Sequence, residues 1–124
     1  MNSELGQRRW AIAEGYIPQS TSDESRELQS HETVCILNAS MRVANVTIMI
    51  YFSDRSPCGP YRFAVDAQRT RHVRFNDLCD PAIVPRGTDF ASVIESDVPI
   101  VAQHTRLDSR QAALALLSTI AFSG

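Results

Sequence analysis

The sequence predicts an all-β fold, a single antiparallel β-sandwich or jelly-roll domain covering residues 1–124. Two observations carry this prediction. Apolar residues recur with a period of two, and turn residues separate the alternating runs at short intervals. β-branched and aromatic residues are enriched in the runs, as is typical of strands. With 44% apolar and 21% charged residues, a chain of this length can bury a core as one domain.

The alternating runs each predict a strand with one buried face. They are residues 45–52, 61–66, 90–95 and 100–107. In the first run Val46, Ile48 and Ile50 occupy alternate positions and should point into the core. Its other face carries Met49 and Tyr51, which are too apolar for a face in water. Either a subunit interface or a covering loop would explain that face.

Turn chemistry predicts where the strands end. Residues 53–60 should form the loop of a hairpin between two strands, and shorter loops or turns are expected at 80–81, 84–87 and 96–97. Residues 20–29 are polar and charged, as in an exposed loop. Residues 110–122 fit either a helix, which Asp108 and Ser109 could cap, or a strand. We favour the strand, because a sheet protein needs a partner for its last edge.

Composition excludes several classes of protein. The net charge of −2 gives no general attraction to nucleic acid or to an anionic membrane. Cys35, Cys58 and Cys79 form no C-x-x-C motif and no signal peptide precedes them, so we expect reduced thiols and a cytoplasmic protein. No apolar run is long enough to span a bilayer. All twelve basic residues are arginines, which fits either compositional drift or contacts of the guanidinium with carboxylates or phosphates.

The three histidines lie inside strand-like runs, each beside a charged or polar residue. The runs are residues 31–32, 71–74 and 104–108. An unpaired ionisable group that points into a sandwich costs several kcal/mol. These side chains should therefore face solvent or a subunit interface, or converge on a polar site.

Long ordered segments of the chain resemble the soluble sensory rhodopsin transducer family. They read WAIAEGYIP at 10–18, SHETVCILN at 30–38, GPYR at 59–62, RHVRFNDL at 71–78, TDFASVI at 88–94, PIV at 99–101 and QHTRLDSRQ at 103–111. The resemblance implies a small all-β sandwich, assembled as a homotetramer, that acts in the cytosol as the signalling partner of a seven-helix sensory rhodopsin. It also implies two further roles suggested for the family: weak DNA binding, and sensing of sugar-like small molecules. Family membership does not guarantee a rhodopsin partner.

The polar residues of the strand-like runs could line a ligand pocket. Aromatic faces and bidentate polar groups recognise sugars and related polyols, and Trp10 and Tyr16 would supply the faces. The candidate ligand-binding residues are Trp10, Glu14, His31, Glu32, His72, Arg74, His104, Arg106 and Asp108. The alternative is that these groups form buried salt bridges and hydrogen bonds with each other.

Other chemistries have less support in the sequence. No H-x-H or H-E-x-x-H spacing points to a metal site, and no cofactor is expected. His104 could act as a general base, with Asp108 orienting its imidazole. The sequence specifies no nucleophile, so we expect the protein not to be an enzyme. Arg69, Arg71 and Arg74 form a basic run that could contact nucleic acid. Charges that protect an edge strand from aggregation would explain that run equally well.

The sequence therefore predicts a non-enzymatic cytosolic signal transducer for a microbial sensory rhodopsin. A module that binds a sugar-like metabolite is the alternative, and a weak DNA-binding protein is a third possibility.

Overall fold

A computed structural model describes residues 4–21, 25–111, 113 and 115–124, and almost all of its regular structure is β. A 3-10 helix, η1 (Phe75–Asp77), follows the fifth strand. The strands in chain order are β1 (Gln7–Tyr16), β2 (His31–Asn38), β3 (Ala44–Phe52), β4 (Cys58–Val65), β5 (Arg69–Arg74), β6 (Asp89–Asp108), β7 (Ala115–Ile120) and β8 (Phe122–Ser123). The predicted all-β fold is confirmed.

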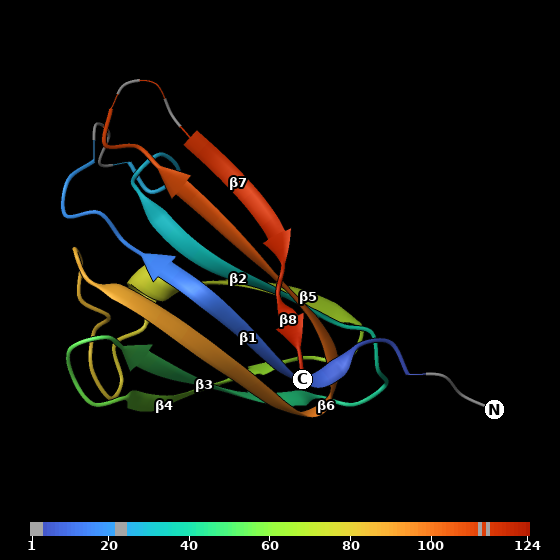
Figure 1. Ribbon diagram of the computed structural model, residues 1–124. Coiled ribbons are helices and arrows are strands. Elements are labelled where there is room, and N and C mark those ends of the chain that lie inside the picture. Colours follow the sequence, from blue (N-terminus) through green and yellow to red (C-terminus); the bar gives the residue numbers. More distant parts are fainter. Residues whose placement is uncertain (1–3, 22–24, 112, 114) are drawn as a thin grey trace.

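The strands form two layers that share one strand (Figure 1). The first layer has the order β4-β3-β6-β1-β8, and the second has the order β5-β2-β6-β7. Every pairing is antiparallel. Because the layers pack face to face, the side chains that alternate inward from each meet in one core.

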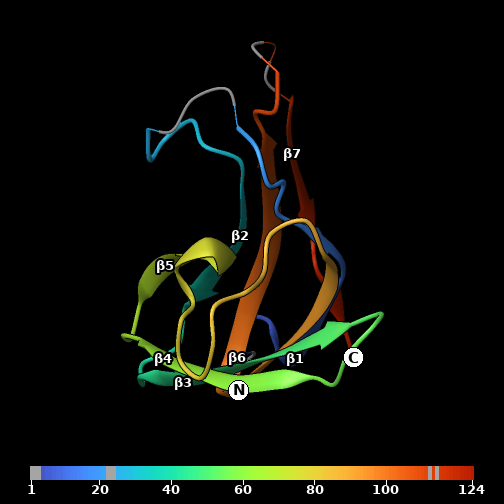
Figure 2. The same cartoon turned by 90° about the vertical axis from the view of Figure 1, so that its left-hand side faces the viewer.

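The shared strand β6 is twenty residues long and bends back on itself, so that its halves lie in different layers (Figures 1 and 2). Its first half pairs with β3 as far as Val46↔Ser96, and its second half pairs with β2 from Leu37↔Val101. The prediction that a turn at 96–97 ends one strand is therefore wrong. The chain changes direction here within one continuous strand, and no loop intervenes.

The predicted inward faces are confirmed. Val46, Ile48 and Ile50 are buried on β3, and Phe90 and Ile94 are buried on β6. The outward positions alternate with them, and Tyr51 keeps 43% of its surface exposed. Burial of these side chains supplies the main favourable free energy of the sandwich.

The loop between β3 and β4 is shorter than predicted, because Cys58 to Pro60 already belong to β4; the two strands do form a hairpin. The loops at 80–81 and 84–87 are confirmed. Of the polar segment 20–29, residues 22–24 lie outside the described part, and Ser20 and 25–28 are exposed as expected.

The C-terminal segment is a strand, as favoured. β7 pairs with β6 in the second layer, and after Ala121 the chain crosses to pair β8 with β1 in the first layer. The Ala121 amide donates to the Ala102 carbonyl at 3.1 Å during this crossing. The segment therefore ties the two layers together along one side of the sandwich.

Trp10 secures the bend of β6. Its indole Nε1–H lies 3.0 Å from the carbonyl oxygens of both Gln7 and Ile100, and its ring is 6% exposed. Gly6 passes the same place at a φ of +98°, where a Cβ would lie 2.1 Å from the Ile100 oxygen. The close approach of β1 to the bend thus requires a residue with no side chain at position 6.

Among the described residues, Ser92 has the one fully buried side-chain polar atom without a hydrogen-bond partner. We expect Ser92→Ala to stabilise the protein by about 1 kcal/mol, because it removes a desolvated, unpaired hydroxyl. Urea unfolding would measure the change. Ser96→Ala is the matched control, since the Ser96 hydroxyl accepts from the Val98 amide at 3.3 Å and its loss should destabilise. Equal effects of the two substitutions would contradict the prediction.

Candidate functional site

A buried carboxylate, Glu32 on β2, organises one end of the sandwich. Its side chain is fully buried. His104 Nε2 donates to Oε1 at 2.6 Å, and Arg106 donates to Oε2 from Nε at 2.9 Å and from Nη2 at 2.7 Å. The Tyr16 backbone amide also donates to Oε2 at 2.6 Å. Donors therefore surround both oxygens of this carboxylate.

This cluster links the two layers. Glu32, His104 and Arg106 come from the second layer, whereas the Tyr16 amide lies at the end of β1 in the first. Arg106 also reaches Glu14 on β1, with Nη1 3.0 Å from Oε2, and the Glu14 side chain is 75% exposed. Burial opposes the charge of Arg106, but its hydrogen bonds to the two carboxylates raise the pKa of Arg106 above its usual value.

Four of the predicted site residues thus meet in one place, namely Glu14, Glu32, His104 and Arg106. Their hydrogen bonds are mostly made to each other. This is the geometry of the structural alternative drawn from the sequence: a charge taken out of water is stabilised by close, aligned partners. Glu32 and His104 line neither the hollow between β4 and β5 nor the one on the outer face of the second layer.

The remaining predicted residues lie elsewhere. Trp10 donates to the Ile100 carbonyl at the bend of β6 and makes no hydrogen bond to the Glu32 cluster. Asp108 accepts from the Arg110 guanidinium at 2.6 Å, which lowers the pKa of Asp108. The Arg110 guanidinium also lies 5.9 Å from the ring centre of Tyr16. Asp108 therefore has Arg110, rather than His104, as its partner.

The three histidines do not converge. The register pairs His104 with Val34, which points inward, whereas His72 pairs with Cys35 on the outer face of the second layer. His31 begins β2, and its Nδ1 lies 2.8 Å from the Gln29 carbonyl oxygen. Strand location was predicted correctly for all three, but strand location alone did not determine which face each would occupy.

Hydroxyl and amide side chains next to Glu32 form a second polar group that the sequence did not reveal. The Ser30 hydroxyl accepts from the Ser109 amide at 2.9 Å, and Thr21 Oγ1 contacts the Ser109 hydroxyl. Asn76 Nδ2 donates to the Ser30 carbonyl at 3.1 Å, and its Oδ1 accepts from the Glu32 amide at 3.3 Å. These residues join four separate segments, so no spacing in the chain could have shown their contact.

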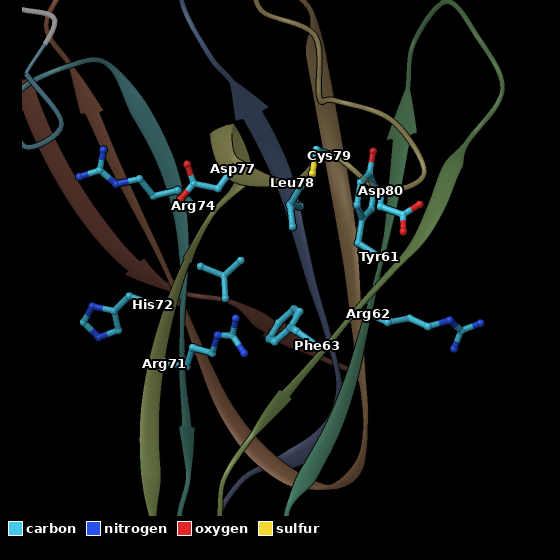
Figure 3. A pocket seen from close by; sticks show the side chains of 11 residues that line it. Tyr61, Arg62, Phe63, Arg71, His72, Arg74, Asp77, Leu78, Cys79 and Asp80 are labelled. Carbon is cyan, nitrogen blue, oxygen red and sulfur yellow. The ribbon is translucent and has the colours of Figure 1, made fainter.

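A hollow of about 280 Å³ lies between β4 and β5, the outermost strands of the two layers on this side (Figure 3). Arg71 crosses it: its guanidinium lies 5.2 Å from the ring centre of Phe63, and Nη1 donates to the Ala64 carbonyl at 2.8 Å. At the far end, burial and the neighbouring Cys58 thiol raise the pKa of Tyr61.

The basic run of β5 is consequently divided. Arg69 is exposed and donates to the Gln68 carbonyl, Arg71 turns toward β4, and Arg74 lies on the opposite face of the strand with His72 (Figure 3). The three predicted nucleic-acid contacts do not form one continuous patch.

Two features are absent from the part of the chain that the structure describes. No group of three or more His, Cys, Asp and Glu side chains has a geometry that could hold a metal ion. In the same part of the chain, no helix has the length and apolar character needed to cross a membrane.

Comparison with known proteins identifies the family. The family model for the Anabaena sensory rhodopsin transducer matches residues 5–123. The chain belongs to this family. A solved structure of the Anabaena sensory rhodopsin transducer is 58% identical, covers 84% of this chain and all of its own, and superimposes with a TM-score of 0.73.

A second solved structure is similar to this chain at lower sequence identity. The crystal structure of Thermotoga maritima 1070 is 29% identical, covers 97% of each chain and has a TM-score of 0.85. No curated protein sequence matches the chain. The resemblance drawn from the sequence is confirmed at the level of the family.

Removing the charge of Glu32 should destabilise this transducer-family protein strongly. We expect Glu32→Gln to lower the free energy of unfolding by about 3 kcal/mol, because it leaves the half-buried Arg106 without its buried counter-charge and puts an amide donor where an acceptor oxygen stood. Glu14→Gln is the matched control, since it removes the exposed carboxylate on the same Arg106 and should change stability by less than about 1 kcal/mol. Chemical unfolding followed by circular dichroism distinguishes them. Similar losses for both would contradict the buried role of Glu32.

His31 should make stability depend on pH. Burial, and then the nearby Arg74 and Arg26, lower the pKa of His31 below its ordinary 6.5. The unfolded chain therefore binds a proton more readily than the folded protein in the window just below pH 6.5, so stability falls as pH drops through that window. We expect His31→Gln to flatten the curve of unfolding free energy against pH there. A curve for His31→Gln that is as steep in this window as that of the unmodified protein would contradict the prediction.

Proposed function

We propose that this protein is a non-enzymatic, cytosolic signal transducer that acts with a microbial sensory rhodopsin. The observation that carries the proposal is the family match over residues 5–123, together with 58% identity to a protein whose name is the Anabaena sensory rhodopsin transducer. The described polar clusters are compatible with this role, because their hydrogen bonds stabilise the sandwich and leave its outer faces available for partners. Binding of a sugar-like metabolite and of DNA stay predictions from the sequence.

We also propose that the protein works as a homo-oligomer, through the outer face of the first layer. The register places four apolar residues side by side across four strands, and we call this set the apolar row: Phe122, Ala11, Val93 and Met49. Phe122 is 74% exposed. Tyr51, two residues beyond Met49 on the same face of β3, is 43% exposed. An exposed row of this kind is typical of a face that another protein covers.

The charges beside the apolar row favour a second copy as the occupant. The neighbouring row runs across β1, β6, β3 and β4 and holds Arg9, Glu95, Thr47 and Arg62. Arg9 Nε lies 3.9 Å from Glu95 Oε2. Both charge signs thus occur beside one apolar surface. Two copies related by a two-fold axis can bring the arginines of one against the glutamate of the other while the apolar rows meet. The homotetramer predicted from the family would need this contact and a second one.

The rhodopsin partnership predicts a measurable change in the photoreceptor. Added to a solubilised sensory rhodopsin from the same cell, the protein should co-purify with it and alter the half-times of its photocycle in a saturable way. The same addition to an unrelated light-driven pump is the control. A photocycle that is unchanged at saturating protein, with no co-purification, would overturn the proposal.

The oligomer contact predicts the effect of a charge in the apolar row. Met49→Arg should reduce the mass measured by light scattering after gel filtration to that of a smaller assembly, because the buried charge would be unpaired. Ile83→Arg is the control, since Ile83 is 72% exposed in the loop before β6 and does not belong to the apolar row. An unchanged mass for Met49→Arg in a folded protein would exclude this interface.

A further inference from the structure

A second hollow lies on the outer face of the second layer, away from the Glu32 cluster. The register pairs Arg74 with Thr33 and His72 with Cys35, and it pairs Thr33 with Thr105 on β6. These side chains therefore project from the same face. Together with Arg26 from the preceding loop they line a cavity of about 440 Å³, which we call the cationic hollow.

His72 and Arg74 line both the cationic hollow and the hollow between β4 and β5, whereas Arg71 lines the latter alone. Figure 3 shows Arg71 pointing toward Phe63, while His72 and Arg74 point to the other side of the strand. The hydrogen bond from Arg71 to the Ala64 carbonyl holds this division in place. One side of β5 thus contributes to packing, and the other side presents cations.

The charges around the cationic hollow are unevenly balanced. Arg26 donates to both oxygens of Asp77, at 3.1 and 2.6 Å, so these two charges largely neutralise each other. Arg74 donates from Nη1 to the Arg26 backbone carbonyl, and among the described residues no carboxylate forms an ion pair with it. Glu27 and Asp77 attract it only from farther away, while burial and the like charge of Arg26 lower the pKa of Arg74. Most of the donors on this guanidinium are left for a ligand.

The floor of the hollow suits a small oxyanion. Thr33 carries a hydroxyl group that can donate to an anionic oxygen. Thr105 Oγ1 donates to Ser118 Oγ at 3.3 Å, and an anion in the hollow would take this proton in place of Ser118. Cys35, whose Sγ lies 3.8 Å from Thr105 Oγ1, adds a thiol. The His72 imidazole adds a ring N–H donor. A planar guanidinium beside hydroxyl donors is the combination that proteins use for phosphate groups, because several charge-assisted hydrogen bonds can form to one tetrahedral anion.

We propose that the cationic hollow binds the phosphoryl group of a small phosphorylated molecule, through Arg74, His72 and the hydroxyls of Thr33 and Thr105. A neutral polyol would leave the guanidinium without a counter-charge. A nucleic-acid backbone would need cations spaced along the surface, but Arg69 and Arg71 are turned away from this face. The proposal concerns a different face from the apolar row, and it holds or fails independently of any rhodopsin partner.

Titration calorimetry with the 124-residue protein tests the binding. Inorganic pyrophosphate and glycerol 3-phosphate should bind, with dissociation constants of about 1 mM or tighter, whereas glycerol should not. In a ¹H–¹⁵N spectrum the amides of Thr33, His72 and Thr105 should shift together on addition of glycerol 3-phosphate. No heat and no shift with either phosphate at about 10 mM would overturn the proposal.

Matched variants locate the site. Arg74→Gln should weaken pyrophosphate binding about tenfold or more, because it removes the charge-assisted hydrogen bonds. Arg74→Lys keeps the charge but loses the planar fork, so it should bind with intermediate strength. Arg69→Gln is the control, since it removes the same charge from the same strand on the opposite face. The thermal unfolding midpoint of each variant verifies that it is folded.

The pattern of losses separates a built site from general electrostatic attraction. Equal weakening by Arg69→Gln and Arg74→Gln would overturn the proposal, because it would indicate attraction to the basic strand as a whole. Calorimetry with a double-stranded oligonucleotide tests whether the ligand is a nucleic acid instead. If it binds more tightly than pyrophosphate and both variants weaken it alike, the ligand is a nucleic-acid backbone rather than a small molecule, and the proposal fails.

Discussion

The pairing of β6 with strands in both layers is the constraint on which the rest of the structure depends. One continuous strand sets the register of β3 and β1 in its first half and of β2 and β7 in its second. The two layers therefore cannot slide past each other without breaking hydrogen bonds of the same strand. The bend between the halves is secured by the Trp10 indole and by the close approach of Gly6 to Ile100.

This constraint brings Glu32 and Arg106 opposite each other on neighbouring strands and places the end of β1 above them. The carboxylate is fully buried, yet its donors offset the cost of removing it from water. Because these polar groups satisfy each other inside the sandwich, the outer faces carry the surfaces that remain open to partners. One face presents the apolar row, and the other presents the cationic hollow.

Local patterns in the sequence were sufficient to predict most strands and their buried faces. Alternation is a property of neighbouring residues, so Val46, Ile48 and Ile50 could be assigned to the core without knowing their partners. The break predicted at 96–97 was wrong because the polar pair Ser96 and Asp97 has the composition of a turn, while pairing with distant strands keeps the chain extended there. Tertiary hydrogen bonding overrode a local preference.

The sequence by itself determined the all-β class, the strand location of the three histidines and the family, because each depends on local order along the chain. Only the tertiary structure decided that His104 faces inward to Glu32 while His72 faces outward beside Arg74. Face and partner depend on the register between strands far apart in the sequence, and a shift of one residue would reverse them. The same register divides the basic run of β5 into a packing side and a side open to ligands.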